Sequence, residues 1–139
     1  MVRILLVEDS AAMRTYVRSA LEGAPELSDD LEIVEAASGF DALRLLPRAA
    51  YHLVITDINM PDINGLELVR FVRQSERHRE IPLLIISTQS SERDRDRGLA
   101  LGANWFLAKP FTPEALRHAV TQSLSGRSSQ PGDDVRSRF

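Results

Sequence analysis

Five short apolar segments alternate along the chain with stretches in which apolar residues recur every three or four positions. Uninterrupted apolar runs of this length are typical of strands buried on both faces, and the spacing of three to four is typical of helices with one buried face. Regular alternation of the two predicts a parallel α/β sheet covered by helices. The strands are expected at residues 2–7, 31–36, 53–56, 82–87 and 105–107.

Polar residues and glycines mark several of the expected helix ends. Ser38 followed three residues later by Asp41 resembles a capping box, and Thr112 before Pro113 provides an N-cap with proline at the first helical position. Gly102 follows the fourth helical segment and is suited to the left-handed conformation that often ends a helix. These signals place helix boundaries where the apolar pattern also changes.

The fourth helical segment, residues 91–97, carries charges all round, and Gly98 interrupts its pattern. One interpretation is a solvated helix face stabilised by ion pairs one turn apart. Another is a marginal helix that shifts easily and lies on a surface where a partner binds. The two interpretations are compatible, and the sequence leaves both open.

Size and composition indicate one globular domain. The chain has 139 residues, of which 43% are hydrophobic, and its apolar periodicity stops near residue 125. We therefore expect a domain at residues 1–125 and a disordered C-terminal tail at 126–139.

Charge and cysteine content exclude several classes of function. Seventeen basic and 20 acidic residues are mixed along the chain, for a net charge of -3, so no direct nucleic-acid surface is expected. The chain has no cysteine, which excludes thiolate catalysis and Cys-ligated zinc. No apolar run approaches the ~18 residues of a membrane span, and no secretory signal is present. We expect a cytoplasmic protein that does not enter membranes.

Polar side chains stand where the expected strands end. Glu8 and Asp9 follow the first strand, Asp57 follows the third, Ser87 ends the fourth, and Lys109 comes just after the fifth. The C-terminal strand ends of an open α/β sheet line the crevice where ligands bind. Alone, each residue would be assigned an ordinary role as a cap, a turn residue or a surface charge. Their joint occurrence favours a functional site.

The three carboxylates favour a metal site. Glu8, Asp9 and Asp57 would repel one another unless some are protonated or a cation lies between them. The three histidines, His52, His78 and His118, have no ligand-pair spacing. Oxygen ligands alone favour a hard cation, and Mg²⁺ fits best because it leaves room for waters and a phosphate oxygen.

Asp57 is the candidate nucleophile. A carboxylate can attack phosphorus to form an aspartyl phosphate. The metal and Lys109 would neutralise the charge of the transferring phosphoryl group, and Ser87 could donate a hydrogen bond to one of its oxygens.

The strand-end residues lie in four motifs, which are Leu6-Val7-Glu8-Asp9-Ser10, Thr56-Asp57-Ile58-Asn59-Met60-Pro61 with Gly65, Ile86-Ser87-Thr88 and Lys109-Pro110-Phe111. These motifs resemble those of the receiver domains of two-component response regulators, particularly the single-domain, chemotaxis-type (CheY-like) receivers. The similarity extends over residues 2–124 and implies a flavodoxin-like (βα)5 fold, a doubly wound, five-stranded parallel sheet with strand order 2-1-3-4-5.

The resemblance implies a role for each acidic residue. Asp57 would accept a phosphoryl group from the phosphohistidine of a sensor histidine kinase or phosphotransfer protein. Asp9 and Asp57 would bind Mg²⁺ together with the backbone carbonyl of Asn59, and Glu8 would act through a metal-bound water. Lys109 would contact the phosphoryl group, and its peptide bond to Pro110 would be cis.

The resemblance also implies a switch. Ser87 would move toward the phosphate, and Phe106 would turn inward, where the family often has a tyrosine. The downstream target would bind the face formed by the fourth helix, fifth strand and fifth helix. We further hypothesise that Asn59 and Thr88, which flank the path of attacking water, set the lifetime of the acyl phosphate.

The favoured hypothesis is a stand-alone, phosphorylation-switched binding module of two-component signalling, with chemotaxis or motility as its setting. Its only chemistry would be self-phosphorylation and autodephosphorylation. One alternative is a Mg²⁺-dependent phosphohydrolase with Asp57 as nucleophile, although Asn59 occupies the position of the usual second aspartate. Another is a phosphorylation-independent adaptor, which would require a broken acidic site, whereas the acidic residues here are all in place.

Overall fold

The computed structural model describes residues 1–27, 30–88 and 92–125. Its strands form one parallel sheet in the order β2-β1-β3-β4-β5. The flavodoxin-like strand order 2-1-3-4-5 is therefore confirmed, and each strand lies within one residue of its expected bounds. The strands are β1 Val2–Val7, β2 Leu31–Ala36, β3 Leu53–Asp57, β4 Leu83–Ser87 and β5 Trp105–Ala108.

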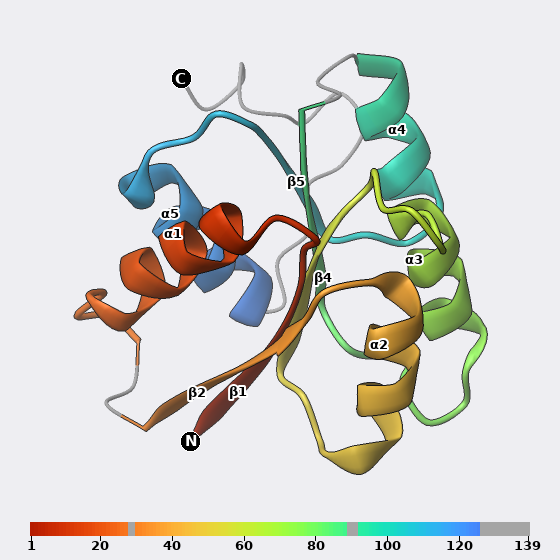
Figure 1. Cartoon of the computed structure of the whole chain (residues 1–139), viewed down its shortest axis with the longest axis horizontal. Coiled ribbons are helices and arrows are strands. Elements are labelled where there is room, and N and C mark those ends of the chain that lie inside the picture. Colours follow the sequence, from red (N-terminus) through yellow and green to blue (C-terminus); the bar gives the residue numbers. More distant parts are fainter. Residues whose placement is uncertain (28–29, 89–91, 126–139) are drawn as a thin grey trace.

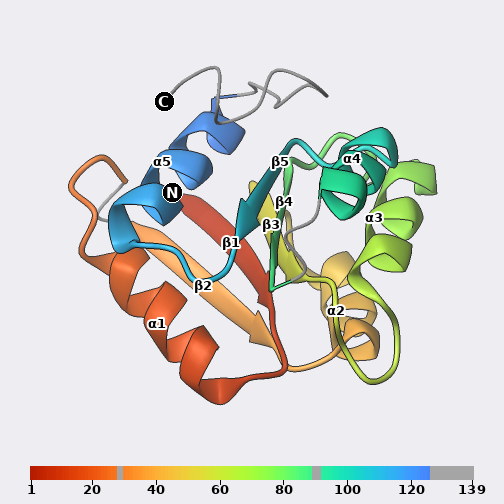
Figure 2. The same cartoon turned by 90° about the horizontal axis from the view of Figure 1, so that it is seen from above.

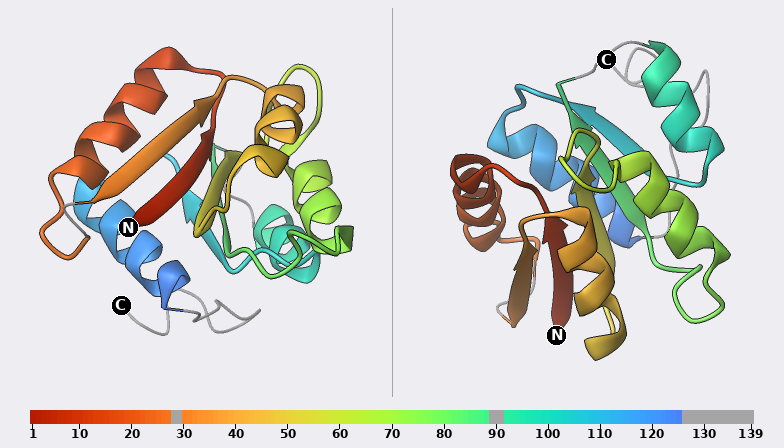
Figure 3. Two further views of the ribbon diagram at one scale, coloured as in Figure 1. Left: turned by 90° about the horizontal axis from the view of Figure 1, so that it is seen from below. Right: turned by 45° about the vertical axis from the view of Figure 1, so that its right-hand side comes forward.

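Helices cover both faces of the sheet, with α1 and α5 on one face and α2, α3 and α4 on the other (Figure 1). Figures 2 and 3 show the same three-layer arrangement from other sides. A 3-10 turn at Leu46–Arg48 follows α2. The helices are α1 Ala11–Glu22, α2 Gly39–Leu45, α3 Gly65–Gln74, α4 Glu92–Ala100 and α5 Pro113–Leu124.

Alternate residues of each central strand enter two separate hydrophobic clusters. In β1, Ile4 and Leu6 pack beneath α1 and α5, whereas Leu5 and Val7 share a cluster with residues of α2 and α3. All four side chains are completely buried. Because both faces of the strand are covered there, β1 is apolar at every position from Ile4 to Val7, which explains the uninterrupted run in the sequence.

The helix ends largely follow the polar signals of the sequence. The Ser38 side chain accepts from the Asp41 amide, and the Thr112 side chain accepts from the amide of Ala115 with Pro113 at the first turn. The Asp41 carboxylate reaches back to the amide of Ala37, so this variant of the capping box is shifted by one residue. Gly102 has φ 116°, the left-handed conformation expected there.

The expectation that Gly98 interrupts the fourth helix is wrong. Gly98 lies inside α4 and is one of its two buried residues, with Leu99. A Cβ atom at Gly98 would lie 2.7 Å from Cδ1 of Ile85, so the glycine allows α4 to lie close to β4. The predicted tail at 126–139 lies outside the described residues.

None of the helices in the described part of the chain is both long and apolar enough to cross a membrane.

Candidate functional site

The ends of β1 and β3 bring the three predicted carboxylates together. Val7 is paired with Thr56 across these parallel neighbours, so the next residues along each strand, Glu8 and Asp57, emerge side by side. One carboxylate oxygen from each of Glu8, Asp9 and Asp57 lies within 4.8 Å of the other two. Asp9 is exposed, whereas Glu8 and Asp57 are 1% and 6% exposed. The cluster is thus open on one side.

Lys109 contacts two of these carboxylates from the end of β5. Its Nζ lies 2.7 Å from Oε1 of Glu8 and 3.6 Å from Oδ2 of Asp57. The longer glutamate side chain, rather than Asp57, therefore forms the short ion pair. Oδ2 of Asp57 is left in weaker contact with the lysine.

The turn after Asp57 is built on close backbone contacts. The Ile58 amide donates to Oδ1 of Asp57 at 2.8 Å, and the carbonyl of Ile58 accepts from the Gly65 amide at 2.8 Å. A Cβ atom at Gly65 would lie only 2.0 Å from the carbonyl oxygen of Asp57. Only glycine allows the start of α3 to come this close to the end of β3.

Burial raises the pKa of both Asp57 and Glu8 above the ordinary range, because desolvation disfavours the charged carboxylates. Lys109 acts against this rise at both residues, and the negative charge of Asp9 adds to it at Asp57. The metal-free cluster is thus electrostatically unfavourable when it is fully ionised. A bound cation would relieve the repulsion, and an all-oxygen donor set fits a hard divalent ion.

Asp57→Asn is expected to stabilise the metal-free protein at neutral pH. The raised pKa means that folding favours the protonated carboxyl, so this contribution is present below about pH 4 and is lost as pH rises through the folded-state pKa. The variant carries no charge there, so its melting temperature should exceed that of the wild type at about pH 7. The difference should shrink or vanish at about pH 3. Thermal melts in chelator at both pH values measure it, and a lower melting temperature at neutral pH would contradict the electrostatic argument.

Arg14 of α1 is a contributor to the site that the sequence did not single out. Its Nη1 donates to the backbone carbonyl of Glu8 at 2.7 Å, and its Nε pairs with Glu35 at 3.0 Å. This arginine ties the acidic turn to the first helix and to β2. The sequence signal that could have indicated this role is the position of Arg14 in the first turn of the helix that follows Glu8 and Asp9.

The other predicted residues lie at or just after the ends of β3 and β4, or within or just after β5. Ser87 is completely buried at the end of β4, where its carbonyl accepts from the Lys109 amide at 2.8 Å. Asn59 and Thr88 are exposed. Phe106 is 6% exposed. It packs in the hydrophobic cluster of α2 and α3, on the face of the sheet opposite to α5. The bond between Lys109 and Pro110 is cis, as the resemblance implied.

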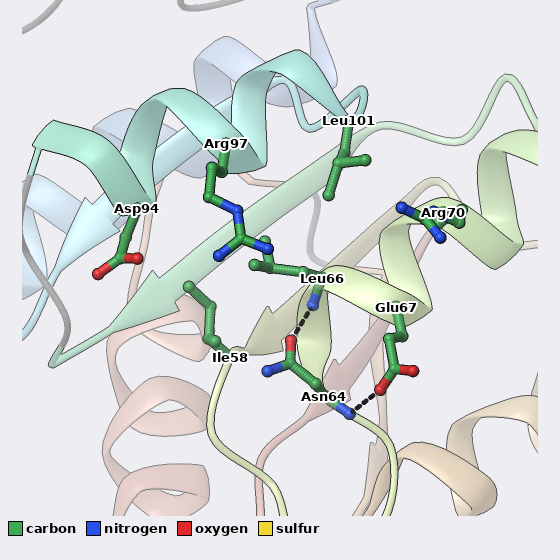
Figure 4. A pocket seen from close by; sticks show the side chains of 8 residues that line it. All are labelled: Ile58, Asn64, Leu66, Glu67, Arg70, Asp94, Arg97 and Leu101. Atoms are coloured by element: carbon green, nitrogen blue, oxygen red, sulfur yellow. Dashed lines mark hydrogen bonds between the residues drawn. The ribbon is translucent and has the colours of Figure 1, made fainter.

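A groove of about 230 Å³ lies between α3 and α4, next to this site (Figure 4). Ile58, which directly follows Asp57, contributes to its wall together with Leu66 of α3 and Leu101. Arg97 projects from α4 toward Leu66 across the groove (Figure 4). Ile58 is therefore shared by the acidic turn and the wall of this groove.

The family model of the response regulator receiver domain matches residues 4–121. The chain belongs to this family.

Similar proteins place this receiver domain in the CheY-like group. The chemotaxis protein CheY homolog of Campylobacter jejuni is 33% identical over 129 residues, covering 92% of this chain and 96% of that protein. The chemotaxis protein CheY1 of Helicobacter pylori is 36% identical over 119 residues, covering 85% and 93%. The structure of Vibrio cholerae CheY4 aligns with a TM-score of 0.79 at 32% identity, covering 88% of this chain and 98% of that one.

The chain is therefore a CheY-like receiver domain of two-component signalling. Receiver domains of this type take phosphoryl groups from histidine kinases and act on downstream targets. The phosphohydrolase and the phosphorylation-independent adaptor are not favoured.

Proposed function

We propose that Asp57 accepts a phosphoryl group from the phosphohistidine of a sensor kinase or phosphotransfer protein, in a reaction that requires Mg²⁺. An Asp57 carboxylate oxygen forms a bond to phosphorus, the bond from phosphorus to the histidine nitrogen breaks, and the imidazole leaves with that electron pair. The observation that supports this is the contact of Lys109 Nζ with both Glu8 and Asp57 inside a cluster of three carboxylates. When the other ring nitrogen of the phosphohistidine carries a proton, the leaving group is neutral imidazole, so the step requires no acid from this protein.

Asp9 and Asp57 would hold the metal directly, with the backbone carbonyl of Asn59, and Glu8 would act through a metal-bound water. Mg²⁺ supplies charge neutralisation at the phosphoryl oxygens. Lys109 would leave its short contact with Glu8 to reach the new phosphoryl group, since it already lies 3.6 Å from Asp57. Asp57 itself is oriented by the Ile58 amide, which donates to its Oδ1 at 2.8 Å.

Phosphorylation would then change which partner binds. Ser87 would turn its hydroxyl toward the phosphoryl group, and Phe106 would be held in the buried position described above. The target would bind the face formed by α4, β5 and α5, in chemotaxis or motility, as the names of the two relatives suggest. Asp57 would serve only in its own phosphorylation and dephosphorylation, because Asn59 offers no carboxyl group to act as a general acid on other substrates.

Incubation with a small acyl phosphate donor and Mg²⁺ tests the proposed function. The intact mass should rise by a single phosphoryl group, and the adduct should be lost on treatment with hydroxylamine, which cleaves acyl phosphates. Chelation of the metal before the donor is added should prevent the adduct. A stable adduct, or one that forms equally well in chelator, would contradict the proposal.

Exchange of Asn59 or Thr88 should change the lifetime of the aspartyl phosphate. Both side chains are exposed beside the site, so they would control how a water approaches phosphorus. Asn59→Arg and Thr88→Ala should each alter the dephosphorylation rate by about 10-fold, within the usual range for groups that position a reactant. Decay of the phosphorylated protein after donor removal measures the rate. Rates equal to that of the wild type would remove both residues from this role.

A further inference from the structure

Asp62 lies in the loop between β3 and α3 and bonds to the first turn of a different helix. Its Oδ1 accepts from the amide of Gly39 at 3.1 Å, and its Oδ2 accepts from the amide of Phe40 at 2.9 Å. Oδ1 also accepts from the amide of Ile63 in its own loop at 2.6 Å. These backbone donors lower the pKa of Asp62 to about 2, with the bond from Phe40 contributing most. The carboxylate therefore stays ionised in its place at the start of α2.

The loop and α2 also meet through a close backbone contact. A Cβ atom at Gly39 would lie 2.6 Å from Cβ of Ile63 and 2.9 Å from the carbonyl oxygen of Ile63. The glycine permits this close approach. The Asp62 carboxylate stabilises the contact by accepting hydrogen bonds from backbone amides of the same helical turn. Two independent features thus join α2 to the middle of the loop.

The two ends of the loop are held in other ways. At its start, the carbonyl of Ile58 accepts from the Gly65 amide. At its end, Asn64 caps α3 by accepting from the Leu66 amide at 2.6 Å, while its own amide donates to Glu67 at 3.1 Å. Among the side-chain hydrogen bonds described for residues 59–63, those of Asp62 connect the loop to another element.

We propose that Asp62 is a positioning residue for the metal site, acting through the loop that carries Asn59. The inference rests on the proposed function, in which the Asn59 carbonyl is a metal ligand. A carbonyl ligand in an unanchored loop would have to be ordered on binding, and that ordering would weaken the metal affinity. Because Asp62 is hydrogen-bonded to α2, the loop is already ordered before the metal binds.

Asp62→Ala should weaken Mg²⁺ binding by about 10-fold, the lower end of the effect typical of groups that support metal ligands. Asp62→Asn keeps one carbonyl acceptor, so its Mg²⁺ affinity should lie between those of the wild type and Asp62→Ala. Titration of ¹⁵N-labelled protein with Mg²⁺, followed through the amide signals of Ile58 and Asn59, measures the affinity without any phosphoryl transfer.

Ser38→Ala is the matched control, because Ser38 caps the same helix through the Asp41 amide at 3.1 Å and has no described hydrogen bond to the loop. It should leave Mg²⁺ affinity within about twofold of wild type. Equal losses in Ser38→Ala and Asp62→Ala, or no loss in Asp62→Ala, would overturn the positioning role.

Amide hydrogen exchange in the metal-free protein separates this inference from the proposed function. Exchange at the amides of residues 59, 60, 62 and 63 should accelerate in Asp62→Ala and not in Ser38→Ala, whether or not the wild type binds Mg²⁺. A wild type that shows no Mg²⁺ response would contradict the proposed function. Unchanged exchange in Asp62→Ala would overturn the loop-ordering role itself.

Discussion

Asp57→Asn is expected to abolish phosphorylation, with the rate of adduct formation falling on the order of 1000-fold or more. An amide oxygen is a far weaker nucleophile than a carboxylate, and the variant also removes one of the oxygens that define the metal cluster. Glu8 is not expected to replace it, because its carboxylate is held by Lys109 and by the amide of Ser10. Intact-mass measurement over time, with an acyl phosphate donor and Mg²⁺, gives the rate.

Two further variants separate chemistry from metal binding and from general charge effects. Asp9→Asn keeps the nucleophile, so its rate should fall less and should recover as Mg²⁺ is raised. Asp96→Asn removes an exposed carboxylate of α4 that lies 3.5 Å from Arg95, and should behave as wild type. Phosphoryl incorporation into Asp57→Asn at an undiminished rate would place the acceptor elsewhere.

Gly65→Ala should be the most damaging change to the fold near the site, lowering the free energy of unfolding by about 3 kcal/mol. The added Cβ would lie 2.0 Å from the carbonyl oxygen and 2.8 Å from the carbonyl carbon of Asp57. These are backbone atoms of a central strand, so they cannot move aside as a flexible side chain could. Urea denaturation measures the stability, and phosphorylation should fall as well because Asp57 must shift.

Gly23→Ala is the matched control for the glycine exchange. Gly23 has φ -88°, and a Cβ atom there would lie no closer than 3.4 Å to its nearest neighbour. The alanine should be neutral or stabilise by up to about 1 kcal/mol, because it restricts the unfolded chain. If Gly65→Ala were as stable as Gly23→Ala, the close approach of α3 to β3 would not require glycine.

The local elements could be predicted because their signals lie within short stretches of sequence. The apolar run Ile4-Leu5-Leu6-Val7 indicated a strand covered on both faces, and the pair Thr112-Pro113 indicated the start of α5. The role of Gly98 could not be predicted, because it depends on how closely α4 approaches Ile85. A glycine that permits packing and a glycine that breaks a helix look the same in the sequence.

The supporting residues of the site were also beyond local patterns. Arg14 reaches the carbonyl of Glu8, and Asp62 reaches the amides of Gly39 and Phe40, 23 and 22 residues away in the chain. Such bonds exist only once separate loops meet at one edge of the sheet. Arginine and aspartate are common in loops and on exposed helix faces, so their residue types alone carried little information.

The sequence by itself determined that Glu8, Asp9, Asp57 and Lys109 stand at strand ends, because a strand's length is set by its own apolar run. Only the tertiary structure decided how they pair. Lys109 Nζ lies 2.7 Å from Glu8 and 3.6 Å from Asp57, and that difference depends on the packing of β5 beside β4 and on the length of the glutamate side chain. Distances between residues 101 positions apart are properties of the folded chain, because no local interaction constrains them.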